Sequence, residues 1–154
     1  MCIIRFGGES NEYLALTICG RNRPDAVDFW DGNWLWCTVE VSAGGFRGSA
    51  DGVLRSEDFV RFLPRLERLY QRLDGVALFD TLDGWLDLQF IGDGRGHIEV
   101  RGQLCDRPMD GNTLEFRLAI DQTFLPPLIR QVRATVGAFP IIGEIPSNQQ
   151  SIDH

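Results

Sequence analysis

Hydrophobic and polar residues alternate along several stretches of the chain, as in β-strands that bury one face. The alternation and the intervening turns predict strands at residues 2–6, 12–19, 33–44, 46–54, 76–81, 84–91, 96–105 and 113–120. In the third strand, Leu35, Cys37, Val39 and Val41 are predicted to face the core, and Trp34 and Trp36 to face the other way. In the sixth, Leu86 is predicted to be buried, so Trp85 and Asp87 are placed on the opposite face. Such alternation is typical of antiparallel sheets with one solvated side.

Two stretches have the apolar period of a helix packed on a sheet. The first follows Ser56, which is predicted to cap the helix, and stops at Gly75. Pro64 is expected to kink this helix or to begin its second half, because proline has no N–H to donate. The second helix is predicted from about residue 123 to 136, after Asp121 or Thr123 as a cap, with Gly137 ending it.

The order of these elements predicts an α+β fold in which a curved antiparallel β-sheet of about 7–8 strands carries two packed α-helices. Residues 20–33 are predicted to form a loop. We expect a single domain over residues 1–137, followed by an irregular, partly mobile tail over 138–154 that is rich in Pro, Gly, Asn, Gln and Ser.

Composition narrows the classes of partner. The chain has 22 carboxylates and 15 basic residues, all of them arginine, for a formal charge of −7. Such a surface disfavours direct binding to nucleic acid or to anionic membranes and favours a basic protein partner. The arginine bias is typical of a GC-rich bacterial genome. No apolar stretch is long enough to cross a bilayer, and the first residues do not form a signal peptide, so we expect a cytoplasmic protein.

The sequence contains few groups suited to catalysis or metal binding. Its four cysteines are far apart and form no Cys-x-x-Cys pair, so we expect reduced thiols, no metal and no cofactor. His97, with Glu99 on the same strand face, could form a general base and its orienting carboxylate, but a solvated strand histidine is the more common arrangement. We therefore expect a binding protein rather than an enzyme.

Acidic residues gather in two segments, and tryptophans lie beside both. Such clusters often form plain solvated surface, but they also suit docking of a cationic partner onto aromatic anchors. The candidate contact residues are Asp25, Asp28, Asp31, Trp34, Trp36, Asp80, Asp83, Trp85 and Asp87. Charge reversal of Asp83 and Asp87 is expected to weaken such binding, with a strong dependence on salt. Two alternatives stay open: a small-molecule or glycan-binding module that uses the tryptophans, and a cryptic enzyme built on His97 and Glu99.

Four segments, in this order, resemble a known family. They are the GGFRG turn (44–48), the FVRFLPRLERLYQRLDG helix (59–75), the GHIEVRGQLCD strand (96–106) and LEFRLAIDQTFLPPLIRQV (114–132). Together they are similar to the WapI-type immunity proteins of bacterial polymorphic toxin systems. The LY-x-x-L-x-G helix and the Asp-Gln-Thr segment at 121–123 are the most specific parts of this resemblance.

The resemblance implies a function. A protein of this family neutralises the toxin domain at the C-terminus of a large secreted protein by stoichiometric occlusion, in the cell that produces the toxin. In the family's namesake that toxin is a nuclease that acts on tRNA. An acidic protein is suited to block the basic substrate cleft of a nuclease, so charge and resemblance imply the same kind of partner. The resemblance assigns no contact residues to this sequence.

Overall fold

The computed structural model of the protein describes residues 1–8 and 11–147, and in this part of the chain eight antiparallel strands form two four-stranded sheets. The first sheet contains, in order, β1 (Cys2–Gly7), β2 (Glu12–Arg21), β3 (Trp34–Ala43) and β4 (Phe46–Arg55). The second contains β5 (Asp74–Phe79), β6 (Leu86–Asp93), β7 (His97–Cys105) and β8 (Thr113–Asp121). The predicted α+β class and antiparallel pairing are confirmed, with the strands divided between two sheets.

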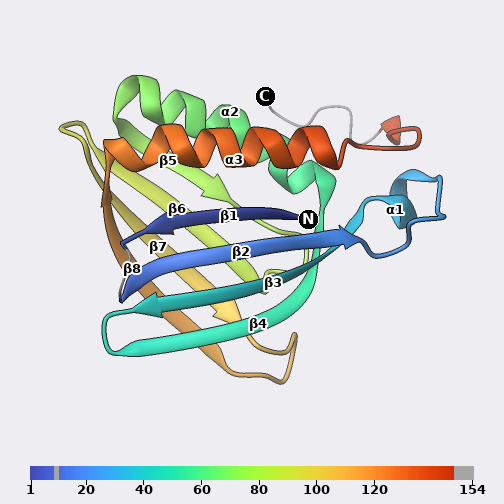
Figure 1. Ribbon diagram of the computed structural model, residues 1–154, viewed down its shortest axis with the longest axis horizontal. Coiled ribbons are helices and arrows are strands. Elements are labelled where there is room, and N and C mark those ends of the chain that lie inside the picture. The colour runs from blue at the N-terminus through green and yellow to red at the C-terminus, as the bar shows by residue number, and fades with distance from the viewer. Residues whose placement is uncertain (9–10, 148–154) are drawn as a thin grey trace.

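The two sheets cross face to face, and the long helices cover one edge of the assembly (Figure 1). The helices α2 (Ser56–Arg72) and α3 (Leu125–Ala138) lie side by side, with α2 packed on β5 and α3 on β1. They therefore bridge the outer strands of the two sheets. Neither long helix covers the outward face of a sheet (Figure 1).

One continuous core lies between the sheets and under the helices. Alternate residues of each strand enter it, as predicted: Leu35 and Val39 from β3, and Leu86 and Phe90 from β6, are buried. Phe62 of α2 contacts Phe90, with ring centroids 5.6 Å apart. A void among core side chains of β1, β2 and α2 has a volume of only about 10 Å³, so this part of the core is filled.

Helix α2 begins one residue earlier than its predicted cap implies. Its N-cap is Arg55, and Ser56 is the first helical residue, so the prediction for Ser56 is wrong. Asp58 accepts a hydrogen bond from the Arg55 amide at 2.8 Å, which satisfies an N–H that the helix itself leaves unpaired. Pro64 lies inside the helix, which is continuous through it.

The end of α2 and the start of α3 also differ from their predicted positions. Helix α2 ends at Arg72, because Leu73 turns into the left-handed region with φ 61° and its N–H bonds the Leu69 carbonyl. Gly75 is already part of β5, so the prediction that it stops the helix is wrong. A 3₁₀ turn, η1 (Gln122–Phe124), precedes α3, and Asp121 caps that turn by accepting the Thr123 amide at 2.8 Å.

The connection between β2 and β3 is more ordered than the predicted loop. It contains a short helix, α1 (Phe29–Gly32), which is held by Asn33 at its end. The buried Asn33 side chain donates to the carbonyls of Phe29 at 2.8 Å and Ile142 at 2.9 Å, and accepts the Ile142 amide at 2.9 Å. Part of the predicted tail is thereby attached to this connection, while residues 148–154 lie outside the described residues.

Candidate functional site

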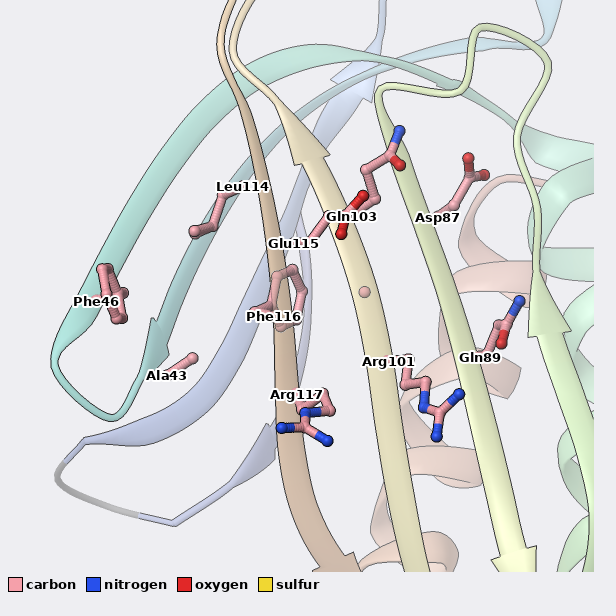
Figure 2. Close-up of a pocket in the computed structure, with 11 residues that line it drawn as sticks. Ala43, Phe46, Asp87, Gln89, Arg101, Gln103, Leu114, Glu115, Phe116 and Arg117 are labelled. Carbon is pink, nitrogen blue, oxygen red and sulfur yellow. The ribbon is translucent and has the colours of Figure 1, made fainter.

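The outward face of β6, β7 and β8 forms a shallow hollow of about 730 Å³ (Figure 2). Because successive strand residues point to opposite faces, the residues between the core positions line it. These lining residues are Asp87 and Gln89 of β6, Arg101 and Gln103 of β7, and Glu115 and Arg117 of β8. The tip of the β3–β4 hairpin forms one rim, where the Phe46 side chain is 70% exposed.

Three charged side chains on this face pair with one another. The Glu99 carboxylate lies 3.2 Å from the Arg101 guanidinium and 3.7 Å from that of Arg117. Asp87 accepts the Thr81 amide at 3.1 Å, which attaches the preceding turn to the strand. The hollow therefore offers polar contacts to a ligand, and its lining residues contain no nucleophile beside a base.

A second exposed site surrounds Arg55, where β4 ends next to the start of β3. Arg55 is the register partner of Trp34, and its guanidinium lies 4.7 Å from the Trp34 ring centroid and 5.3 Å from that of Trp30. Its N–H groups donate to Glu57 at 2.6 Å and to the carbonyls of Trp30 at 2.9 Å and Phe29 at 2.8 Å. The Arg55 residue itself is only 3% exposed. These bonds fix the aromatic rings beside the acidic loop.

The structure brings the first predicted cluster together at this end of the molecule. Asp28 caps α1 by accepting the Asp31 amide at 3.1 Å, and Asp31 pairs with Arg23 at 3.2 Å. Asp25, Asp28 and Asp31 are all exposed. Trp36, which is 43% exposed, and the half-buried Trp34 face outward from β3, as predicted.

The second predicted cluster is divided. Asp80 forms an ion pair with Arg65 of α2 at 2.8 Å. Burial raises the pKa of Asp80, but the hydrogen bond and charge of Arg65 outweigh it, so that the pKa lies below its ordinary value. Asp83 is exposed in the turn before β6, and Asp87 lies in the hollow of the second sheet.

The expectation for Trp85 is wrong. The residue precedes β6, is only 3% exposed, and packs its indole on Gly52 of β4. Alternation of the following strand could not predict this position, because the chain bends between Trp85 and Leu86 and both side chains are buried. Trp85 is therefore part of the core and cannot anchor a partner at the surface.

Sequence reasoning also missed Arg55, Trp30 and Phe46. Arg55 stands beside the acidic start of a helix, where an arginine is ordinarily expected at the surface. Trp30 lies in the segment 20–33 that is predicted to form a loop. The one available signal was the register of the β3–β4 hairpin, which pairs Arg55 with Trp34.

The two alternative functions find little support in this geometry. His97 is exposed, and neither His97 nor Glu99 lines the hollow. The tryptophans do not line it either, which disfavours a glycan platform there. Within residues 1–8 and 11–147 no cluster of three or more His, Cys, Asp or Glu side chains could hold a metal ion. None of the helices described is long and apolar enough to cross a membrane.

Comparison with known proteins supplies the family. A search of curated proteins gives no match. The model of the immunity protein WapI-like family matches residues 5–140. This range includes all the described strands and helices apart from the first three residues of β1. Because the match covers most of the 154 residues, this chain belongs to the WapI-like family of immunity proteins.

Proposed function

We propose that this chain is a cytoplasmic immunity protein that neutralises the toxin domain of a polymorphic toxin by forming a stoichiometric complex, without catalytic turnover. Membership of the WapI-like family is the observation that carries the proposal. The toxin is a nuclease with a basic substrate cleft, and the protein occludes that cleft. The net charge of −7 supports this choice, because an acidic protein attracts a basic domain and repels nucleic acid.

The exposed end of the first sheet has the composition of a protein-binding surface. Trp30 is 46% exposed and Trp36 43%, and the acidic loop lies next to them. Aromatic residues dominate the binding energy of many interfaces, while surrounding charges raise the association rate. The Arg55 contacts hold Trp30 and Trp34 in place before a partner arrives, which reduces the entropy lost on binding.

The predicted contact residues lie on two different sides of the molecule. Asp25, Asp28, Asp31, Trp34 and Trp36 belong to the first sheet and its loop, whereas Asp87 lies on the outward face of the second. Because the sheets pack face to face, a single toxin domain cannot centre on both outward faces. We therefore propose that one of the two faces carries the main contact.

The proposal is tested with the toxin domain encoded beside this gene. Co-expression of this chain is expected to restore growth to cells that produce the toxin domain, and the purified proteins are expected to elute as a one-to-one complex in size-exclusion chromatography with light scattering. RNA and DNA integrity in the unprotected cells then identifies the toxin's activity. Failure both to rescue growth and to bind would overturn the immunity proposal. Rescue of a toxin that leaves nucleic acids intact would remove only its nuclease assignment.

A further inference from the structure

Small side chains occupy the centre of the outward face of the first sheet. The strand register places Thr38 of β3 between Thr17 of β2 and Asp51 of β4. In the next row, Glu40 lies between Ala15 and Ser49. Four of these six positions thus carry Ala, Ser or Thr, in the middle of a sheet whose adjacent row carries Trp36.

These short side chains leave a shallow hollow of about 510 Å³ that none of the predicted contact residues lines. Its floor is formed by Ala15, Thr17, Thr38 and Ser49, and its charged boundary by Glu40, Arg47 and Asp51. Figure 1 shows β2, β3 and β4 on the side toward the viewer, with both long helices displaced to the edge of the sheet. The hollow is therefore open to a large partner.

The two carboxylates at this hollow differ in their present contacts. Glu40 accepts a hydrogen bond from the Tyr13 hydroxyl at 2.6 Å, which orients it and, by the same bond, raises the pKa of Tyr13. The Asp51 side chain is exposed, and its carboxylate makes no hydrogen bond or ion pair with any described residue. An unpaired carboxylate beside an oriented one is a suitable acceptor pair for an arginine or lysine side chain.

The other two surfaces are less suitable for a basic partner. Helices α2 and α3 carry six arginines, and Glu67 is their only carboxylate outside the core. On the outward face of the second sheet, Glu99 already pairs with Arg101 and Arg117. Among the residues that the structure describes, only the first sheet combines a carboxylate without a side-chain partner, exposed tryptophans and the acidic loop at its end.

We propose that the outward face of β2–β4 is the surface on which the toxin domain docks. A cationic side chain from the basic face of the toxin lies across Thr38 and reaches Glu40 and Asp51, while Trp36 packs against neighbouring apolar surface. This inference rests on the proposed function, because the occupant is the cognate toxin. To the proposed function, this inference adds the docking face, the residues that surround the hollow and the charge of the group that enters the hollow.

Two substitutions in the hollow and one matched substitution on the opposite sheet test the inference. Thr38→Arg fills the hollow and brings a positive charge to it, and Asp51→Asn removes the unpaired charge at almost constant volume. Gln89→Arg introduces the same side chain on the outward face of the second sheet. Each variant is first compared with the wild type by circular dichroism and urea unfolding, so that a folding defect is recognised. Affinity for the purified toxin domain is then measured by calorimetry at low and moderate salt.

The inference predicts that Thr38→Arg weakens binding by about 100-fold or more, as expected for a bulky like-charged group at the centre of an interface. Asp51→Asn is expected to weaken binding about tenfold and to reduce its salt dependence. Gln89→Arg is expected to stay within about threefold of the wild type. If Thr38→Arg does not fold, Asp51→Asn and Asp51→Lys supply the same comparison.

The outcomes separate this inference from the proposed function. If the wild-type chain binds the toxin domain and both Asp51→Asn and Asp51→Lys bind it with the same affinity, the docking face is overturned. The immunity function is then left intact. Loss of binding in Gln89→Arg alone would move the contact to the second sheet. If the wild-type chain neither binds nor protects, the proposed function fails, and this inference fails with it.

Discussion

The indole N–H of Trp85 donates a hydrogen bond to the backbone carbonyl of Val53 at 2.8 Å. Val53 lies on β4, the last strand of the first sheet, and Trp85 directly precedes β6 of the second sheet. The bond satisfies a carbonyl on a strand edge that has no further strand to pair with. One buried side chain thus joins the two sheets and caps an edge that could otherwise pair with another chain.

Replacement of Trp85 should destabilise the fold in two distinguishable steps. Trp85→Phe keeps most of the apolar ring but loses the bond to Val53, so we expect a loss of about 1 kcal/mol in the free energy of unfolding. Trp85→Ala also leaves a cavity above Gly52 and should cost about 3–5 kcal/mol. Urea unfolding followed by circular dichroism measures both values. Trp36→Phe, at an exposed position, is the matched control and should change stability by less than about 0.5 kcal/mol.

Arg55→Lys is predicted to destabilise the protein although it conserves the charge. The lysine ammonium cannot reach Glu57 and the carbonyls of Phe29 and Trp30 together, as the planar guanidinium does. We expect a cost of about 2–4 kcal/mol, because buried groups then lose their partners. Urea unfolding measures the loss, and intrinsic tryptophan fluorescence reports the changed surroundings of Trp30 and Trp34.

Two further variants determine whether this cost comes from the buried charge. Arg23→Lys changes the exposed pair with Asp31 and should alter stability by less than about 0.5 kcal/mol. A variant that combines Arg55→Met with Glu57→Gln should be more stable than Arg55→Met alone, since it leaves no unpaired buried carboxylate. Equal stability of these two variants would show that the charge of Glu57 contributes nothing.

Most of the fold could be predicted because it depends on local pattern. Alternation along the strands and the apolar stripes of α2 and α3 predicted all eight strands and both long helices, with shifts at their ends. Alternation also assigned Leu35 and Phe90 to the core. It could not divide the strands between two sheets, since that depends on contacts between distant parts of the chain.

The candidate site was less predictable than the fold. Exposed positions such as Asp28 and Trp36 were recognised from charge and alternation, but the pattern does not show which exposed residues share a face of the folded molecule. Asp51 lies in the predicted strand 46–54, and only the register places it beside Thr38. The prediction that Trp85 faces outward is wrong because a bend just before β6 interrupts the alternation.

Asp58 should make stability depend on pH between about 4 and 6. Burial raises its pKa from 3.8 to about 6, although the Arg55 amide and Arg61 oppose the shift. Because the folded state then binds the proton more tightly than the unfolded state, this contribution stabilises the protein below pH 3.8 and is lost as the pH rises through about 6. Asp58→Asn removes it, so the difference in unfolding free energy between wild type and variant should shift by up to about 2–3 kcal/mol across this range.

Asp80 acts in the opposite direction. The pKa of Asp80 is lowered, so its contribution is present above its unfolded pKa and is lost as the pH falls. The wild type and Asp58→Asn share this contribution of Asp80. Subtracting the variant's free energy of unfolding from that of the wild type at each pH therefore removes it. Urea unfolding at intervals from pH 4 to pH 8 supplies the two curves. A difference that stays constant with pH would contradict the raised pKa of Asp58.

Asn33→Ala should release the segment after α3 from the acidic loop. The Asn33 side chain makes two hydrogen bonds with the backbone of Ile142 and one with that of Phe29, all in a site where Asn33 is fully buried. Removal leaves these backbone groups without their partner, at a cost of about 1–3 kcal/mol. Hydrogen exchange should show the Ile142 amide losing its protection, while amides in the centre of β7 keep theirs under conditions where the domain stays folded.

The Arg21 bond to the Pro140 carbonyl, at 2.6 Å, remains in this variant and limits the release to the part of the segment beyond it. Unchanged exchange at Ile142 would show that Gly143, which packs against the Phe29 backbone, holds the segment without Asn33.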